Sequence, residues 1–181
     1  EIPDYIRELI DAGELEEIRI DAEGNWSHAG ESFQNQRIID FFNRSIDVTA
    51  DGIYVIRYGP FVHPIVVEDA PVFITGVRLE GFGDFERVFV TPTTGIEEEL
   101  DINTLGFRRP GGLYCRVREG RLQAKFRRSP SFQILDRLEE SDDTFYITLC
   151  GQRILLAEKA GARALECIRS RERHPRSTRA G

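Results

Sequence analysis

The strongest chemical signal in the sequence is an arginine-rich stretch between residues 105 and 128. It holds one acidic residue, Glu119, and eight basic ones: Arg108, Arg109, Arg116, Arg118, Arg121, Lys125, Arg127 and Arg128. From residue 121 onward basic and apolar residues alternate, so a strand there would have one cationic and one apolar face. Because a guanidinium binds oxyanions through paired hydrogen bonds, the cationic face predicts a site for a small anionic ligand or an acidic protein partner.

The same stretch has a second interpretation, because acidic and basic residues are divided between the halves of the chain. Residues 1–100 contain 21 Asp and Glu against 7 Arg, whereas residues 101–181 contain 10 Asp and Glu against 17 Lys and Arg. The cationic face could therefore be an internal seam that pairs with the acidic N-terminal half. Nucleic acid is disfavoured as a partner, because the net charge of the chain is −7.

Two adjacent carboxylates, Glu68 and Asp69, stand at the end of a predicted strand, just before Ala70-Pro71. Because proline favours an extended residue before it, both carboxylates would hold fixed positions. We predict that Glu68 is structural and pairs with backbone amides or an arginine, and that Asp69 contacts the ligand. A side-chain cap of the turn is the alternative role of Asp69. The predicted ligand-binding residues are Glu68, Asp69, Trp26, Arg121, Arg127 and Arg128.

Residues that could perform catalysis are few, and no catalytic residue is predicted. The sequence lacks a Gly-x-Ser-x-Gly motif, and His174 lies in the polar C-terminal tail. The alternative to a binding protein is a small hydrolase or transferase that uses Glu68, Asp69 and His28. It requires a histidine within about 3 Å of a carboxylate. His28 shares a predicted strand face with Trp26, which favours a packed histidine over a catalytic one.

Neither a metal nor a nucleotide cofactor is predicted. Cys115, Cys150 and Cys167 form no Cys-x-x-Cys pair, and the histidines and carboxylates lack the spacing of zinc ligands. Gly81-Phe82-Gly83 lacks the further glycine of a phosphate-binding loop, which favours a hairpin turn. Unpaired cysteines and an N-terminus without secretion features predict a cytoplasmic protein, and no apolar stretch is long enough to cross a membrane.

Hydrophobic periodicity predicts an α+β protein with mostly antiparallel sheet, in which two tandem β-hairpin–helix–β-hairpin repeats are joined by additional β-structure. The first repeat is predicted from a hairpin at 18–28, a helix at 33–46 and a hairpin that pairs 53–58 with 65–68. The second is predicted from a hairpin at 114–128, a helix that is capped by Ser129 and includes Leu138, and a hairpin at 145–157. Convergence of two generic patterns is the alternative to a duplication.

These elements predict four segments along the chain. They are an N-terminal helix with the first repeat at 1–72, a connecting β-segment at 73–112, the second repeat with a C-terminal helix at 113–170, and a flexible tail at 171–181. The N-terminal helix is placed at 3–13, because Pro3 suits a first turn and Gly13 ends the helical pattern. The C-terminal helix is placed at 159–169.

Several of these segments resemble a bacterial family known as domain of unknown function 1285. In the first half, the resemblance rests on Ile20-Asp21, Gly24-Asn25-Trp26, Asp51-Gly52-Ile53-Tyr54 and Val67-Glu68-Asp69-Ala70-Pro71. In the second half, it rests on the run at 114–124 and on Arg128-Ser129. It spans residues 16–158. The resemblance implies a repeat-built α+β fold and a ligand-binding or signalling role, without an established activity.

The sequence as a whole predicts a non-enzymatic binding module in signal transduction. It would bind a small anionic ligand or an acidic protein partner near the junction of the two repeats. A purely structural interaction subunit is a further alternative, which a flat apolar surface without a cleft would favour. The sequence leaves open whether the protein forms a homo-oligomer.

Overall fold

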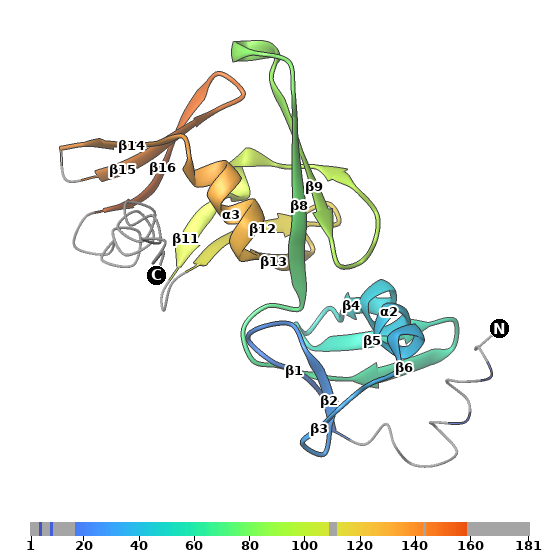
Figure 1. Cartoon of the computed structure of the whole chain (residues 1–181). Coiled ribbons are helices and arrows are strands. Elements are labelled where there is room, and N and C mark those ends of the chain that lie inside the picture. Colours follow the sequence, from blue (N-terminus) through green and yellow to red (C-terminus); the bar gives the residue numbers. More distant parts are fainter. Residues whose placement is uncertain (1–3, 5–7, 9–16, 109–111, 143, 159–181) are drawn as a thin grey trace, which may run out of the picture.

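The computed structural model describes residues 4, 8, 17–108, 112–142 and 144–158. The helices predicted at 3–13 and 159–169 and the tail at 171–181 therefore lie outside the described residues, apart from positions 4 and 8. Figure 1 shows two bodies, an N-terminal one below and a C-terminal one above, connected by the long strand β8 (Val72–Glu80). Within the described residues, no helix is long and apolar enough to cross a membrane.

From residue 17 onward, the described part of the N-terminal body consists of two small sheets and one helix. Its elements are β1 (Ile18–Ile20), β2 (Trp26–His28), β3 (Glu31–Ser32), α2 (Gln36–Ser45), β4 (Ile46–Val48), β5 (Tyr54–Tyr58), β6 (Phe61–Pro64) and β7 (Val66–Val67). One sheet has the strand order β3-β2-β1-β7, and the other has the order β4-β5-β6. The β1–β7 pair is parallel, and the other described pairs of this body are antiparallel.

The C-terminal body is built around a six-stranded sheet with the order β10-β9-β8-β13-β12-β11. Its further elements are the short helix η1 (Gly83–Phe85), β9 (Arg87–Pro92), β10 (Glu98–Glu99), the short helix η2 (Ile102–Thr104), β11 (Gly106–Arg108), β12 (Gly112–Val117), β13 (Leu122–Phe126), helix α3 (Arg128–Leu135), β14 (Leu138–Ser141), β15 (Thr144–Leu149) and β16 (Gln152–Glu158). The last three strands form a separate sheet in that order. The β8–β13 pair is parallel.

A hydrophobic core runs through both bodies. In the N-terminal body, helix α2 begins after Asn35, whose side chain accepts a hydrogen bond from the backbone N–H of Arg37. Phe42 on this helix is completely buried, and its ring centroid lies 5.2 Å from that of Trp26 and 5.3 Å from that of Phe33. This aromatic cluster holds the first hairpin against the helix.

The second hairpin of the N-terminal body differs from the predicted one. Strand β5 pairs with β6 across Gly59-Pro60, so that Tyr58 lies opposite Phe61. Of the segment predicted as the return strand, 65–68, Ile65 still donates a backbone hydrogen bond to the carbonyl oxygen of Tyr54 at 3.0 Å, but Val66-Val67 leaves this sheet and pairs parallel with β1. The predicted pairing was wrong because a turn of only two residues brings the next residues directly into register, which leaves 66–68 free to cross to another sheet.

Helix α3 also differs from its prediction at both ends. Its N-cap residue is Arg127 rather than Ser129, and this cap makes no side-chain hydrogen bond. Ser129 lies inside the first turn instead. Leu138 begins β14, where it lies opposite the buried Ile147 of β15. Pairing with a buried strand residue therefore outweighs the helical spacing of Leu138.

The predicted α+β class is confirmed, whereas the tandem repeat stays a prediction. Each body contains a hairpin, a helix and a three-stranded antiparallel sheet in that order. The strand that pairs with the hairpin differs between the bodies. In the N-terminal body β7 pairs with β1, the first strand of the hairpin, whereas in the C-terminal body β8 pairs with β13, the second strand of the hairpin. The connecting segment at 73–112 supplies β8 to β11 of the six-stranded sheet, and the Gly81-Phe82-Gly83 turn joins β8 to β9, as predicted.

The two bodies meet where Phe73, near the start of β8, packs on Gly24 in the β1–β2 turn. Gly24 has a positive φ of +90°, and a Cβ atom at this position would lie 2.8 Å from Cδ2 of Phe73. Gly30, in the next turn, has a similar φ of +86° but no atom within 4 Å of such a Cβ. The two glycines therefore share a backbone requirement and differ in packing.

We expect Gly24→Ala to lower the free energy of unfolding more than Gly30→Ala. Both alanines are strained at positive φ by about 1–2 kcal/mol. Gly24→Ala adds overpacking against Phe73 of about 1–3 kcal/mol, which urea unfolding of the two variants measures as a difference. Equal losses in the two variants would contradict a tight contact between the bodies at Gly24.

Candidate ligand-binding site at the junction of the two bodies

The β1–β2 turn is shaped by the carboxylate of Asp21. It accepts hydrogen bonds from the backbone N–H groups of Glu23 at 2.9 Å and Asn25 at 2.8 Å, and from the side-chain amide of Asn25 at 2.9 Å. Burial acts to raise the pKa of Asp21, but these hydrogen bonds outweigh it and lower that pKa below its usual value. The turn is thereby held in one conformation, with the carbonyl oxygen of Ala22 available to the C-terminal body.

Asp69, in the linker between β7 and β8, is bound by two residues of the β12–β13 hairpin. Its carboxylate accepts hydrogen bonds from the hydroxyl of Tyr114 at 2.9 Å and from Nζ of Lys125 at 2.5 Å. Tyr114 and Lys125 lie opposite each other in β12 and β13. Nζ of Lys125 also donates a hydrogen bond to the carbonyl oxygen of Ala22 at 3.1 Å. We call these four residues, Ala22, Asp69, Tyr114 and Lys125, the junction network.

Glu68 has a different partner from Asp69. Its carboxylate accepts a hydrogen bond from Arg19 at 3.0 Å, so the prediction that Glu68 pairs with an arginine is confirmed. His28 lies in β2 opposite Ile18 and Glu31, and within the described residues it donates no hydrogen bond to Glu68 or Asp69. The part of the chain that the structure describes contains no cluster of His, Cys, Asp and Glu that could hold a metal ion.

Part of the arginine-rich hairpin faces the N-terminal body. Arg118 donates hydrogen bonds to the carbonyl oxygens of Arg44 at 2.8 Å and Ile46 at 2.6 Å, at the C-terminal end of α2. The last carbonyls of a helix lack partners within the helix and carry partial negative charge, so a guanidinium is favourable there. Arg121 forms an ion pair with Asp47 at 2.7 Å. Arg118 and Arg121 therefore belong to a seam between the bodies.

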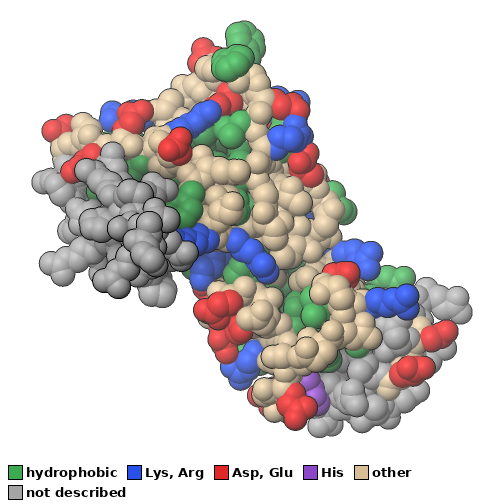
Figure 2. Space-filling view, in the orientation of Figure 1, with side chains coloured by type: hydrophobic (Ala, Val, Ile, Leu, Met, Phe, Trp, Pro, Cys, Tyr) green, Lys and Arg blue, Asp and Glu red, His purple; other side chains and the backbone are tan. Residues whose placement is uncertain are grey.

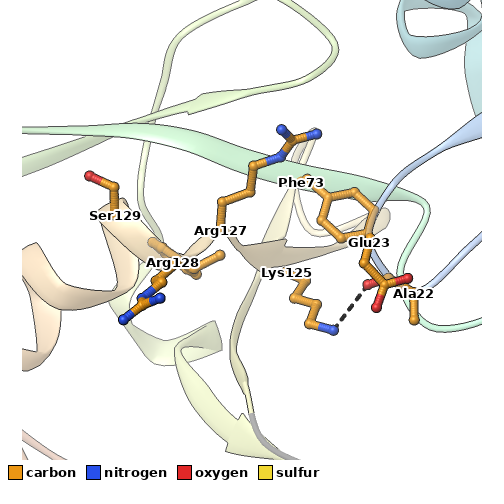
Figure 3. A pocket seen from close by; sticks show the side chains of 8 residues that line it. Ala22, Glu23, Phe73, Lys125, Arg127, Arg128 and Ser129 are labelled. Carbon is orange, nitrogen blue, oxygen red and sulfur yellow. Dashed lines mark hydrogen bonds between the residues drawn. The ribbon is translucent and has the colours of Figure 1, made fainter. Parts of the chain in front are cut away.

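Arg127 and Arg128 differ from Arg118 and Arg121. Within the described residues, neither side chain forms an ion pair or donates a hydrogen bond. Their guanidinium groups lie near aromatic rings, with Arg127 at 5.9 Å from the ring centroid of Phe73 and Arg128 at 5.5 Å from that of Phe132. Figure 3 shows the two guanidinium groups pointing in opposite directions. The two arginines therefore present their charges to different parts of the surface.

Two surface depressions flank Arg127. The first has a volume of about 560 Å³ and is mainly polar; we call it the amide groove, and its lining includes Asn25, Gln34, Gln36, Asp40, Asn43 and Arg127. The second is shallower, with a volume of about 470 Å³; we call it the phenylalanine depression, and its lining includes Glu23, Phe73, Lys125, Phe126, Arg127 and Arg128 (Figure 3). Each depression is lined by residues of both bodies.

The amide groove holds hydrogen-bonding groups whose orientation is fixed by the core. Nε1 of the buried Trp26 donates a hydrogen bond to Oδ1 of Asn43 at 2.9 Å, which leaves the NH₂ group of Asn43 as a donor. Oγ1 of Thr93 accepts a hydrogen bond from the backbone N–H of Phe73 at 3.2 Å, which leaves its own hydrogen to donate. With the guanidinium of Arg127, the groove therefore offers several donors to an anion or a carbonyl group.

Comparison with known proteins identifies the fold. Two solved structures are similar, and the first is a DUF1285 family protein from Silicibacter pomeroyi DSS-3, with a TM-score of 0.65 and 20% identity over 78% of this chain and 80% of that chain. The second, a DUF1285 family protein from Shewanella baltica OS155, has a TM-score of 0.52 and 22% identity over 66% of this chain and 90% of that chain. This chain has the DUF1285 fold. Neither a protein-family model nor a curated protein matches the sequence.

The structure brings three of the six predicted ligand-binding residues to the two depressions. Trp26 lines the amide groove, Arg128 lines the phenylalanine depression, and Arg127 lines both. The other three bind protein partners: Glu68 binds Arg19, Asp69 binds Lys125 and Tyr114, and Arg121 binds Asp47. The amides and hydroxyls of the groove could not be predicted from the sequence, because single polar residues from a loop, a helix and a turn have no common spacing.

We expect Asp69→Asn to lower the free energy of unfolding by about 1–3 kcal/mol, because it leaves the charge of Lys125 partly buried without a countercharge. Lys125→Gln should cost less in the Asp69→Asn background than in the wild type, with a coupling of about 1 kcal/mol in a double-mutant cycle. Glu68→Gln is the matched control, because its ion pair with Arg19 is exposed to solvent and should contribute little to stability. If the two substitutions lower the free energy of unfolding additively, Asp69 and Lys125 do not interact.

The junction network also predicts a titration at high pH. Burial and the hydrogen bond to Asp69 raise the pKa of Tyr114 to about 12. Because the folded state favours the neutral hydroxyl, this contribution to stability is complete below about pH 10 and is lost as the pH rises towards 12. Ultraviolet absorbance should show one late-titrating tyrosine that is missing in Tyr114→Phe. An ordinary titration of Tyr114 would contradict its burial beside a carboxylate.

Proposed function

We propose that this protein is a non-enzymatic binding module that holds a small anionic ligand in the amide groove, in a signalling pathway. The observation that carries the proposal is the guanidinium of Arg127, which has no carboxylate partner within the described residues, whereas Arg118 and Arg121 are bound to the N-terminal body. Arg127 is the anchor for the anionic group of the ligand.

The surroundings of Arg127 support an anchoring role. Its backbone N–H donates a hydrogen bond to the carbonyl of Ile74 at 3.0 Å, which fixes the residue at the end of the β8–β13 pair. Its guanidinium lies over the ring of Phe73, so the side chain is oriented before a ligand binds. Orientation before binding reduces the entropy that a ligand has to overcome.

The amide groove has the size and chemistry of a small-molecule site. Its volume of about 560 Å³ falls within the range that such sites usually have. The free donors of Asn43 and Thr93 can bind oxygen atoms of the ligand, while Asp40 can accept hydrogen bonds from hydroxyl groups. These groups favour a ligand with one anionic end and a neutral polar remainder.

A ligand in the groove would touch both bodies, because Asn43 belongs to the N-terminal body and Thr93 and Arg127 to the C-terminal one. Binding would therefore stabilise one arrangement of the two bodies relative to others. This coupling is the physical basis for a signalling role. If the predicted tandem duplication is correct, the groove lies where the two repeats meet.

The enzymatic alternative has less support from the geometry. A hydrolase or transferase that uses Glu68, Asp69 and His28 needs a histidine beside one of the carboxylates. Glu68 is instead bound by Arg19, and both oxygens of Asp69 accept hydrogen bonds from the junction network. The three residues therefore contribute to the junction, and the binding module is favoured.

We expect a small anion that raises the melting temperature of the wild type to bind Arg127→Gln at least about ten-fold more weakly. Arg121→Gln removes the same charge but acts on the ion pair with Asp47, so it should change the affinity by less than about two-fold. A panel of phosphorylated and carboxylated metabolites in a thermal-shift screen, followed by calorimetry at two salt concentrations, measures both values. Equal losses in the two variants would contradict an anchoring role of Arg127.

A further inference from the structure

One side of helix α2 presents polar side chains to the amide groove. Gln36, Asp40 and Asn43 are spaced four and three residues apart, so they lie on the same side of the helix and line the groove together. The opposite side of the helix contains Ile38 and Phe42, which are buried in the core. Because this packing fixes the rotation of the helix, it also fixes which polar groups face a ligand.

The hydrogen bonds on this side of the helix leave an acceptor beside a donor. Oδ1 of Asp40 accepts a hydrogen bond from Nε2 of Gln36 at 2.8 Å, and no donor of the described residues binds Oδ2 of Asp40. The oxygen of Asn43 is bound by Trp26, so its NH₂ group remains a donor. The Cβ atoms of residues three apart on a helix are about 5–6 Å from each other. Neighbouring hydroxyl groups, which both donate and accept, match this pair.

The charges of the groove suit a ligand with a single anionic group. Among the described residues that line it, Arg127 is the only cation and Asp40 is the only carboxylate. A second anionic group on the ligand would lack a cation and would meet the negative charge of Asp40. Figure 2 shows Lys and Arg side chains where the two bodies meet, and their charge favours the approach of an anion to this part of the molecule.

The groove offers little surface to an aromatic or apolar ligand. Trp26 is only 2% exposed, and Phe33 is half-buried against Phe42. Planar bases bind largely by stacking on aromatic rings, and apolar ligands bind by contact with hydrophobic walls. Most other side chains of the lining contain amide, hydroxyl or charged groups. These walls suit hydroxyl groups better than an aromatic ring.

We propose that the amide groove binds a sugar phosphate or a sugar acid, that is, a polyhydroxylated molecule with one anionic group. This assignment rests on the proposed function and adds the chemical class of the ligand. Arg127 binds the phosphate or carboxylate, whereas Oδ2 of Asp40 and the NH₂ group of Asn43 bind hydroxyl groups. The hydroxyl of Thr93 donates a further hydrogen bond from the C-terminal body.

The substitution Asp40→Asn distinguishes a hydroxyl contact from a purely electrostatic role of Asp40. It keeps an oxygen atom for Gln36 and replaces the unbound oxygen by an NH₂ group, which cannot accept a hydrogen bond. It also removes a negative charge, which by itself strengthens the binding of any anion. The two roles therefore change the affinity for a sugar phosphate in opposite directions.

Titration calorimetry of the purified chain tests the proposal. The polyhydroxylated anions are glucose and ribose with a terminal phosphate, inositol monophosphate and glucuronate; inorganic phosphate, succinate and glycine lack hydroxyl groups. We expect at least one polyhydroxylated anion to bind at least about ten-fold more tightly than any of the other three. This molecule should bind Asp40→Asn about ten-fold more weakly, while inorganic phosphate binds that variant equally well or better. The phosphates against glucuronate identify the anionic group.

Asp51→Asn is the matched control, because Asp51 is exposed in a turn outside the groove and Asn-Gly suits the same turn as Asp-Gly. It should change each affinity by less than about two-fold. Without ligand, both variants should keep the melting temperature of the wild type, because both substitutions are at exposed positions.

Failure of the ligand class can be distinguished from failure of the proposed function. If inorganic phosphate or succinate binds through Arg127 as tightly as every polyhydroxylated anion, or if Asp40→Asn strengthens the binding of the sugar phosphate, only the ligand class is overturned. Tighter binding of glycine indicates an ammonium group at Asp40 and also overturns the ligand class. If no anion binds, or if Arg127→Gln binds each of them like the wild type, both proposals are overturned.

Discussion

Nζ of Lys125 donates hydrogen bonds to the carboxylate of Asp69 and to the carbonyl oxygen of Ala22. It therefore joins the β12–β13 hairpin to the linker between β7 and β8 and to the β1–β2 hairpin. The side chains of Lys125 and Asp69 are each only 21% exposed, so each charge needs the other as its partner. The hydroxyl of Tyr114 completes the set by donating to the same carboxylate. Because these bonds fix the β1–β2 turn against β8 and β13, they also set the walls of both depressions.

The position of the junction network explains why the arginine-rich hairpin serves two purposes. At the turn between β12 and β13, Arg118 binds the end of α2 and Arg121 binds Asp47, and these contacts neutralise part of the acidic N-terminal half. Beyond Lys125, the chain passes into helix α3, and Arg127 and Arg128 have left the reach of those acceptors. Arg118 and Arg121 therefore belong to the seam, whereas the proposed binding surface uses Arg127, which follows the hairpin.

The sequence predicted local elements better than the contacts between them. The hairpins at 18–28 and 114–128 were correct because their turns carry glycines and their strands alternate. The partner of β5 was predicted wrongly, because a two-residue turn and a longer loop leave similar patterns in a single sequence. The pairing of Glu68 with an arginine was predicted. Nothing in the sequence around Asp69 indicates that it pairs with Lys125, which lies 56 residues further along the chain. Contacts over such separations depend on the packing of whole bodies, which periodicity does not encode.

Arg127 lines both the amide groove and the phenylalanine depression. Its guanidinium lies near the ring of Phe73, and Phe73 packs on Gly24 of the opposite body. The proposed ligand in the groove would therefore contact a side chain that lies over a residue of the contact between the two bodies. By thermodynamic linkage, any effect of the ligand on the arrangement of the two bodies equals the effect of that arrangement on ligand affinity. The proposed binding module could in this way transmit occupancy of its groove to the arrangement of its two bodies without any catalytic residue.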